Sequence, residues 1–194
     1  TWMLTRTVRN SSLASIIRTG TPPARSAENV LEKFGTELVP ISGPQQLEAY
    51  KAVDLKAAEA EAEEYWLKPA KKIVEPTREE IVNSARLYLA IKDLMIRHRA
   101  RAVASTLCMN TPCNACLAFS KLNDLGLVGA CEGDIDSTLT MLMFGYAFGK
   151  PGFITDPLFD VSRNAVIHAH CVASTMMDGP GTKRHPFLIR THRD

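Results

Sequence analysis

The clearest periodic pattern in the chain is a helical stripe that follows Pro76. Thr77 and Glu80 have the spacing of a capping box, in which a Thr hydroxyl and a Glu carboxylate bond free backbone N–H groups at a helix start. The apolar positions that follow recur every three or four residues: Ile81, Ala85, Tyr88, Ile91 and Met95. The pattern predicts a long amphipathic helix that begins here and buries one face.

Beyond this helix, short apolar runs alternate with helical patterns. The predicted order is strand 102–107, helix 112–125, strand 126–131, helix 135–148, a very short strand 153–154, strand 164–175 and an edge strand 187–189. Strands and helices that alternate through short loops are typical of a parallel sheet covered on both faces. We therefore predict an α/β fold in which a Rossmann-like layer of parallel strands is flanked by helices.

The N-terminal part of the chain has a weaker pattern. Within residues 1–44 we predict only a short helix at 26–34 and a strand at 36–41, whereas 45–71 is rich in Ala, Glu and Lys at helical spacing. We therefore divide the chain into an irregular or incomplete N-terminal segment, 1–44, and an α/β domain, 45–194. The opening residues have no initiator character, and we expect the chain to be a piece of a longer protein.

Composition and charge narrow the class of protein. The 194 residues hold 23 basic and 21 acidic side chains, which are scattered, so we expect no nucleic-acid partner. No apolar run approaches the ~18 residues of a membrane span, so we expect no membrane partner. Five cysteines in a chain of this apolar content do not suit a secreted disulfide framework. A reduced, cytoplasmic protein is the better expectation.

Three cysteines have a spacing that occurs in iron–sulfur proteins. Cys108, Cys113 and Cys116 are separated by four and two residues, and Cys131 or Cys171 could supply a fourth ligand. The surrounding residues, however, predict a strand end, a turn and a helix instead of an irregular Gly-rich loop. We therefore favour small buried thiols near a strand end over a metal cluster.

Carboxylates follow two of the predicted strands. Glu132 comes directly after the strand 126–131, and Asp156 follows the short strand 153–154. Residues just past strand ends meet at one edge of a parallel sheet, which is where such folds place their chemistry. Asp134 or Asp136 is better explained as the cap of the next helix. We predict that Glu132 and Asp156 meet at the sheet edge, where they hold a divalent metal and transfer protons.

Histidines could complete this site. His168 and His170 are two residues apart and point to the same face if they lie on a strand, and His192 is near the end of the chain. Two carboxylates with one or two imidazoles suit Mn²⁺, Mg²⁺ or Zn²⁺. The spacing does not decide whether His170 or His192 is the ligand.

These segments resemble the L-fucose isomerase and L-arabinose isomerase superfamily, in particular its fucose-isomerase-like branch. The similar segments are Cys-Glu-Gly-Asp-Ile-Asp at 131–136, the helix at 139–148, Gly-Lys-Pro-Gly-Phe-Ile-Thr-Asp at 149–156 and Ala-His-Cys at 169–171. The resemblance runs from about Phe34 to the end of the chain. The Glu-to-Asp spacing with a helix between is its more specific part.

The resemblance implies a Mn²⁺-dependent aldose–ketose isomerase that acts on a sugar through a cis-enediol. It implies that Glu132 and Asp156 are both metal ligands and acid–base catalysts, with His170 or His192 as a further ligand. It also implies a homo-oligomer. Chains of this family are much longer and have several domains, so substrate-binding residues would lie outside this sequence or come from a neighbouring subunit.

One alternative belongs to another class of protein. The chain could be a non-catalytic α/β binding module in which the carboxylates are helix caps and cysteines hold zinc or an iron–sulfur cluster. Nucleotide chemistry is not supported, because the sequence has no Gly-x-Gly-x-x-Gly or Walker loop.

Overall fold

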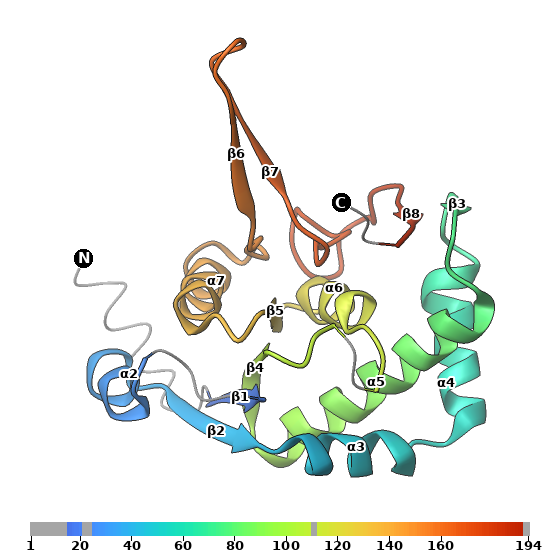
Figure 1. The fold of residues 1–194 in the computed structure, drawn as a ribbon, viewed down its shortest axis with the longest axis horizontal. Helices are drawn as coiled ribbons and strands as arrows, with labels where there is room; N and C mark the ends of the chain where they lie inside the picture. Colours follow the sequence, from blue (N-terminus) through green and yellow to red (C-terminus); the bar gives the residue numbers. More distant parts are fainter. Residues whose placement is uncertain (1–14, 21–24, 110–111, 192–194) are drawn as a thin grey trace.

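A four-stranded parallel sheet forms the centre of the molecule. We describe a computed structural model, which places residues 15–20, 25–109 and 112–191. The sheet strands are β1 (Ser15–Thr19), β2 (Glu37–Ile41), β4 (Ala100–Ser105) and β5 (Val128–Cys131). Their order is β2-β1-β4-β5, and every neighbouring pair is parallel (Figure 1). The predicted α/β fold is therefore confirmed at the level of a parallel sheet packed against helices.

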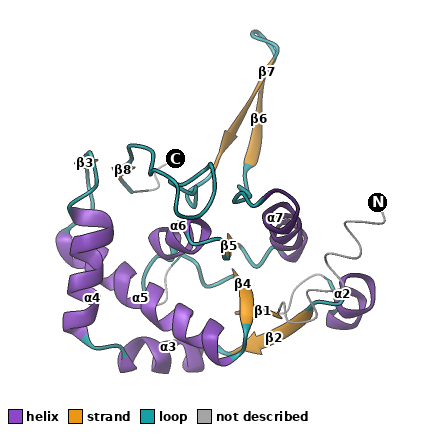
Figure 2. Ribbon diagram, turned by 180° about the vertical axis from the view of Figure 1, so that it is seen from behind, coloured by secondary structure: helices purple, strands orange, loops and turns teal. Residues whose placement is uncertain are grey.

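Helices cover both faces of this sheet. Figures 1 and 2 show α2 (Ala27–Phe34) and α7 (Ile135–Phe148) on one side, with α5 (Arg78–Arg97) and α6 (Cys116–Asp124) on the other. An outer layer of α3 (Gly43–Ala52), α4 (Leu55–Ala62) and the π-helical turn η1 (Glu63–Leu67) packs against α5. Because both faces are covered, the strands can be apolar throughout.

Local sequence signals set the helix ends. Ser26 caps α2 and Gly35 ends it in the left-handed conformation. Thr77 and Glu80 exchange the two hydrogen bonds of a capping box at the start of α5. Of the two candidate caps for α7, Asp134 accepts the backbone N–H of Ser137 and so is the cap.

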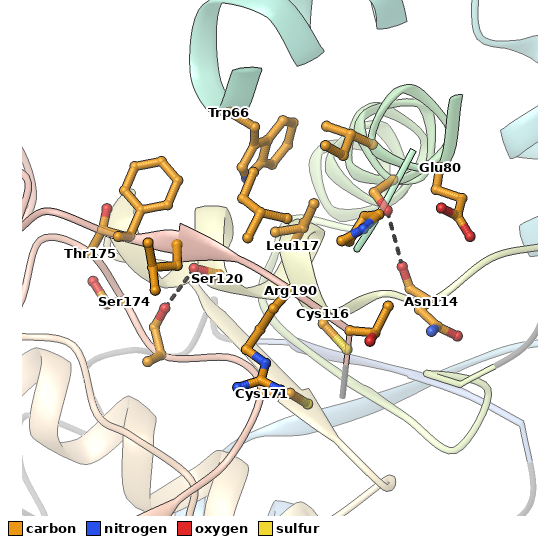
Figure 3. A pocket seen from close by; sticks show the side chains of 18 of the residues that line it. Trp66, Glu80, Asn114, Cys116, Leu117, Ser120, Cys171, Ser174, Thr175 and Arg190 are labelled. Carbon is orange, nitrogen blue, oxygen red and sulfur yellow. Dashed lines mark hydrogen bonds between the residues drawn. The ribbon is translucent and has the colours of Figure 1, made fainter. Parts of the chain in front are cut away.

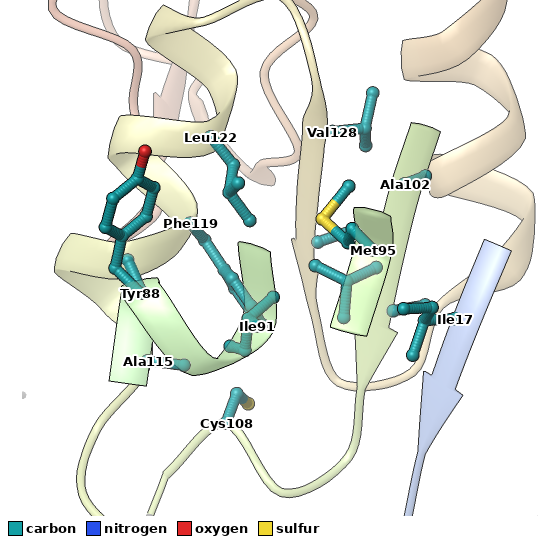
Figure 4. Packing of buried hydrophobic residues seen from close by; sticks show 14 of the residues in the cluster. Ile17, Tyr88, Ile91, Met95, Ala102, Cys108, Ala115, Phe119, Leu122 and Val128 are labelled. Carbon is teal, nitrogen blue, oxygen red and sulfur yellow. The ribbon is translucent and has the colours of Figure 1, made fainter. Parts of the chain in front are cut away.

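The core lies between the sheet and the helices α5 and α6. Figure 4 shows apolar side chains from both helices packed against β1, β4 and β5. Gly129 in β5 permits the closest approach, since a Cβ there would lie 2.6 Å from the Cα of Phe119 in α6. Phe119 and Leu122 are fully buried as a result.

The N-terminal segment is more regular than we expected. In its described part, residues 15–41 form the strand β1, the helix α2 and the strand β2. β1 lies in the middle of the sheet, between β2 and β4. β1 pairs with β2 on one side and with β4 on the other, so the sheet contains strands from both sides of position 45.

Two of the strand predictions were wrong. Phe153 and Ile154 belong to a loop, and no strand forms there. The predicted strand at 164–175 is shorter, β7 (Ala165–Ala169), and it pairs antiparallel with β6 (Asp156–Asp160) in a separate hairpin. The hairpin projects away from the body (Figure 1). Apolar alternation predicts a strand but does not specify which partner strand it pairs with.

The C-terminal residues run back across α5 and α6. Leu188–Ile189 forms the predicted edge strand, β8, which pairs in parallel with β3 (Lys72–Ile73) and not with the main sheet. None of the helices in the described ranges combines the length and apolar content that crossing a bilayer requires.

Candidate functional site

Glu132 lies in a tight turn at the carboxyl end of β5. Its φ angle is 63°, in the left-handed region, and Gly133 follows with a φ of 67°. A left-handed conformation is unfavourable for a residue with a side chain, and such strain concentrates at functional sites. The turn packs closely against Thr106 at Gly133. A Cβ at this glycine would lie only 2.5 Å from Cγ2 of Thr106. The backbone therefore directs Glu132 away from the core at the strand end.

Asp156 and His170 reach the same place through the hairpin. Asp156 begins β6 and is the register partner of Ala169, the last residue of β7, so His170 follows directly beside it. The expectation that Asp156 follows a strand of the main sheet is wrong. Antiparallel pairing within this hairpin, and not the edge of the main sheet, brings the Asp156 carboxylate beside His170.

The three side chains converge. Nε2 of His170 is 4.0 Å from Oε1 of Glu132 and 4.0 Å from Oδ2 of Asp156. The imidazole is nearly buried, with 7% of its side chain exposed, whereas the carboxylates of Glu132 and Asp156 are 68% and 86% exposed. His192, the other candidate ligand, lies outside the described residues. A fixed imidazole thus faces two carboxylates that can rotate.

This donor set suits a hard divalent ion in its chemistry but is not a compact ligand group, since among the described residues the ligand atoms that all lie within 4.8 Å of one another are those of Cys131, His170 and Cys171. Carboxylate oxygens with an imidazole nitrogen suit Mn²⁺ or Mg²⁺. Adjacent ligands of an octahedral ion with bonds of about 2.1 Å are roughly 3 Å apart. The 4.0 Å separations therefore have to shorten by about 1 Å. Rotation of the exposed carboxylates toward His170 can supply this movement.

His168 does not share the site. It lies within β7, and its Nδ1 is 2.9 Å from the hydroxyl of Thr155. His170 comes after the end of the strand, so strand alternation does not apply to the pair. The expected common face of the two histidines is therefore not observed.

The cysteines that lie together in the structure are not the three that the sequence spacing suggests. Sγ of Cys131 is 3.9 Å from Sγ of Cys171, whose sulfur is also 3.6 Å from Nδ1 of His170. Cys108 is hydrogen-bonded to Cys131, and Cys116 to Cys171. Cys113 is apart from this group and contacts Ser84. The Cys108, Cys113, Cys116 set therefore does not form a ligand group among the described residues.

Hydrogen bonding gives these thiols different pKa values. The pKa of Cys108 is lowered to about 6, mainly because the thiol of Cys131 donates to its sulfur and a backbone N–H of Glu132 adds a second bond. The pKa of Cys131 is raised, first by its hydrogen bond to Cys108 and then by its bond to Cys171. The pKa of Cys116 is raised by its hydrogen bond to Cys171 and by burial.

A cavity of about 810 Å³ opens beside these residues. Its walls come from α5, α6 and the segment 170–191, and they include both His170 and Cys171. Figure 3 shows the thiols of Cys116 and Cys171 at the end of the cavity away from Trp66. Ser, Thr, Asn and Arg side chains also line it, so a polar ligand of moderate size could bond its walls.

A buried carboxylate holds the segment 170–191 that forms one wall of the cavity. The sequence did not single out this residue. Asp124 is fully buried at the last residue of α6. It accepts hydrogen bonds from the following donors: the hydroxyls of Tyr65, Ser174 and Thr175, and the backbone N–H groups of Thr175 and Met176. A carboxylate is unfavourable at the C-terminus of a helix, and this signal could have marked Asp124 as held by other groups. The bonds anchor the segment that follows His170 and Cys171.

Comparison with known proteins adds no family assignment. No family model matches the chain, and no curated protein matches it.

Proposed function

We propose that the protein is a Mn²⁺-dependent aldose–ketose isomerase whose site is formed by Glu132, Asp156 and His170. One observation carries the proposal: Nε2 of His170 lies 4.0 Å from a carboxylate oxygen of each partner. The three residues come from the end of β5, the start of β6 and the residue after β7.

The donor set matches the chemistry of this reaction. When bound, the ion would polarise the carbonyl and hydroxyl oxygens of the sugar. Glu132 and Asp156 would hold it together with the imidazole of His170. The near-burial of that ring keeps the nitrogen donor in one orientation, while both carboxylates remain open to an incoming sugar.

The same carboxylates are placed to transfer protons. Isomerisation needs a base that removes the proton from C2 of the aldose and an acid that returns one to C1 of the enediol, while a second proton moves from O2 to O1. Glu132 and Asp156 are the exposed acidic groups beside His170, so we assign the transfers at C2 and C1 to them. General acid–base catalysis of this kind contributes ~10²–10⁴-fold to the rate.

The adjacent cavity supports a small polar substrate. His170 lies on its wall, whereas Glu132 and Asp156 do not line it, so a substrate would have to extend past His170 to meet the carboxylates. Hydroxyl and amide side chains on α5, α6 and the C-terminal segment can bond the hydroxyl groups of a sugar. Our proposal therefore has the sugar extend from this cavity past His170, with its C1 and C2 toward Glu132 and Asp156.

Metal binding and isomerisation test this proposal together. Purified protein with Mn²⁺ is incubated with L-fucose or L-arabinose in deuterated water, and ketose formation and deuterium at C1 of the ketose are followed by NMR. We expect Glu132→Gln and Asp156→Asn to lower kcat by ~10²–10⁴-fold. Both variants should also bind Mn²⁺ more weakly in an electron paramagnetic resonance titration.

Nearby acidic residues provide matched controls. Asp136→Asn changes an exposed carboxylate that pairs with Arg25, and Asp160→Asn changes one at the far end of β6. Both controls should keep Mn²⁺ affinity and turnover. Equal Mn²⁺ binding by wild type, Glu132→Gln and Asp156→Asn would refute the proposal, whether or not the sugars tested are the natural ones.

A further inference from the structure

A set of sulfur ligands lies on the other side of His170. Nε2 of the ring faces Glu132 and Asp156, while Nδ1 is 3.6 Å from Sγ of Cys171. Sγ of Cys131 lies 3.9 Å from the same sulfur. The ligand atoms of Cys131, His170 and Cys171 all lie within 4.8 Å of one another. One imidazole therefore separates an oxygen-rich site from a sulfur-rich one.

The sulfur-rich side has the dimensions of a tetrahedral metal site. With Zn–S bonds of about 2.3 Å and Zn–N bonds of about 2.0–2.1 Å, tetrahedral angles place two sulfurs roughly 3.8 Å apart. The same geometry places a sulfur and a nitrogen roughly 3.6 Å apart. The observed separations of 3.9 Å and 3.6 Å agree with both values. These two separations need little change for an ion to bind, and the third, between Cys131 and His170, is within 4.8 Å.

Further thiols surround these three ligands. Cys108 is a hydrogen-bond neighbour of Cys131, and Cys116 of Cys171. Cys108 and Cys131 are buried, and Cys116 and Cys171 line the cavity, so an ion could enter from that side. Either neighbour is placed to supply a fourth ligand. Thiolates prefer soft or borderline ions such as Zn²⁺ and Cd²⁺, whereas carboxylates prefer Mn²⁺ and Mg²⁺.

We propose that Cys131, Cys171 and Nδ1 of His170 form a binding site for a thiophilic divalent cation such as Zn²⁺ or Cd²⁺. The site does not require the proposed isomerase function, but the two share one ring. A neutral imidazole bound through Nδ1 carries its proton on Nε2 and cannot ligate a second ion there. A thiophilic cation should therefore displace Mn²⁺ from His170.

The wild-type protein provides a test that needs no substitution. The full chain is reduced with a phosphine, freed of metal and titrated with Cd²⁺ and, separately, with Zn²⁺. We expect one equivalent of Cd²⁺ to produce a thiolate-to-metal charge-transfer band. X-ray absorption of the Zn²⁺ form should show at least two sulfur neighbours at about 2.3 Å. A zinc shell of oxygen and nitrogen alone, with no charge-transfer band, would overturn the proposal.

Variants identify the ligands. Because second-shell partners of a metal contribute 10–100-fold in affinity, loss of a direct ligand through Cys131→Ser or Cys171→Ser should weaken Cd²⁺ binding by roughly 100-fold or more. Cys113→Ser removes a thiol outside the group and should bind like wild type. Circular dichroism verifies that each variant is folded. Unchanged affinity in folded Cys131→Ser and Cys171→Ser would contradict the assignment.

The two proposals fail independently. Glu132→Gln and Asp156→Asn should keep the Cd²⁺ charge-transfer band, since neither carboxylate belongs to the sulfur site. Loss of Mn²⁺ binding in these variants with Cd²⁺ binding intact supports both sites. Intact Cd²⁺ binding in a protein that never binds Mn²⁺ supports the thiol site and refutes only the isomerase. Retention of Mn²⁺ at His170 in the presence of saturating Zn²⁺ would contradict the shared ring.

Discussion

At the scale of single residues, the environment of each side chain separates residues that the sequence presents as similar. Cys113 and Cys116 are three positions apart, but Cys113 contacts Ser84 whereas Cys116 joins the group around Cys171. Among the acidic residues after β5, Asp134 is used as a helix cap, and Glu132 remains exposed beside His170. Spacing along the chain suggests which residues could act, and the surroundings decide which of them can.

Cys113 should remain a neutral thiol at an unusually high pH. Burial raises its pKa to about 11, against an ordinary value of 9.0. Between these values the unfolded chain has lost a proton that the folded chain keeps, so the free energy of unfolding should fall as pH rises. We expect Cys113→Ser to reduce this fall in denaturation measurements from pH 9 to 11. Alkylation of Cys113, followed by mass spectrometry, should have a midpoint near pH 11, and a midpoint near 9 would contradict this assignment.

At the scale of elements, the site depends on how two segments are tied to the body. The hairpin register places His170 beside Asp156, and the end of α6 holds the residues that follow. Asp124 is the residue that makes this second connection, through donors on Tyr65 and on residues 174–176. The positions of His170 and Cys171 therefore depend on a helix that contributes neither of them.

Removal of the Asp124 charge should destabilise this connection. Asp124→Asn replaces an acceptor oxygen with an NH₂ group that faces hydrogen-bond donors in a buried site. We expect the free energy of unfolding to fall by about 3 kcal/mol, measured by urea denaturation. Asp93→Asn is the matched control, because Asp93 lies near the end of α5 in an exposed pair with Arg97 and should cost less than about 1 kcal/mol. Equal losses in the two variants would show that Asp124 does not anchor the segment.

At the scale of the whole molecule, the parallel sheet and the hairpin differ in their support. β1 and β4 lie inside the sheet under helices, with Ile16, Ile17 and Val103 buried. The hairpin projects from the body, and its side chains, including Leu158, Phe159 and Val161, are mostly exposed (Figure 1). An isolated two-stranded hairpin is marginally stable in water.

Hydrogen exchange should show this difference directly. We expect amides of β6 and β7 to exchange about 100-fold or more faster than those of β1 and β4, because opening the hairpin does not disturb the core. Deuterium uptake of peptic peptides, measured by mass spectrometry, would test this. Protection of β6 and β7 equal to that of the sheet would contradict the prediction.

Much of the fold follows from local signals in the sequence. The capping boxes, the αL glycine after α2 and the apolar stripe of α5 specify their elements through contacts within a few residues. The bounds of α7 and the placement of Glu132 after β5 could be predicted for the same reason. The central position of β1 could not be predicted, because the sequence of a strand does not indicate which distant strand it pairs with.

The candidate site divides in the same way. The sequence by itself determined which residues carry suitable chemistry, namely Glu132, Asp156, His170 and the thiols, since residue type and strand ends are local properties. Only the tertiary structure decided that a hairpin brings Asp156 and His170 to Glu132, and that Cys131 pairs with Cys171 instead of Cys113. The physical reason is that the turn fixes the register of the hairpin locally. The position of the hairpin beside β5 and the contact between Cys131 and Cys171 join segments far apart in the chain, and these depend on packing across the whole fold.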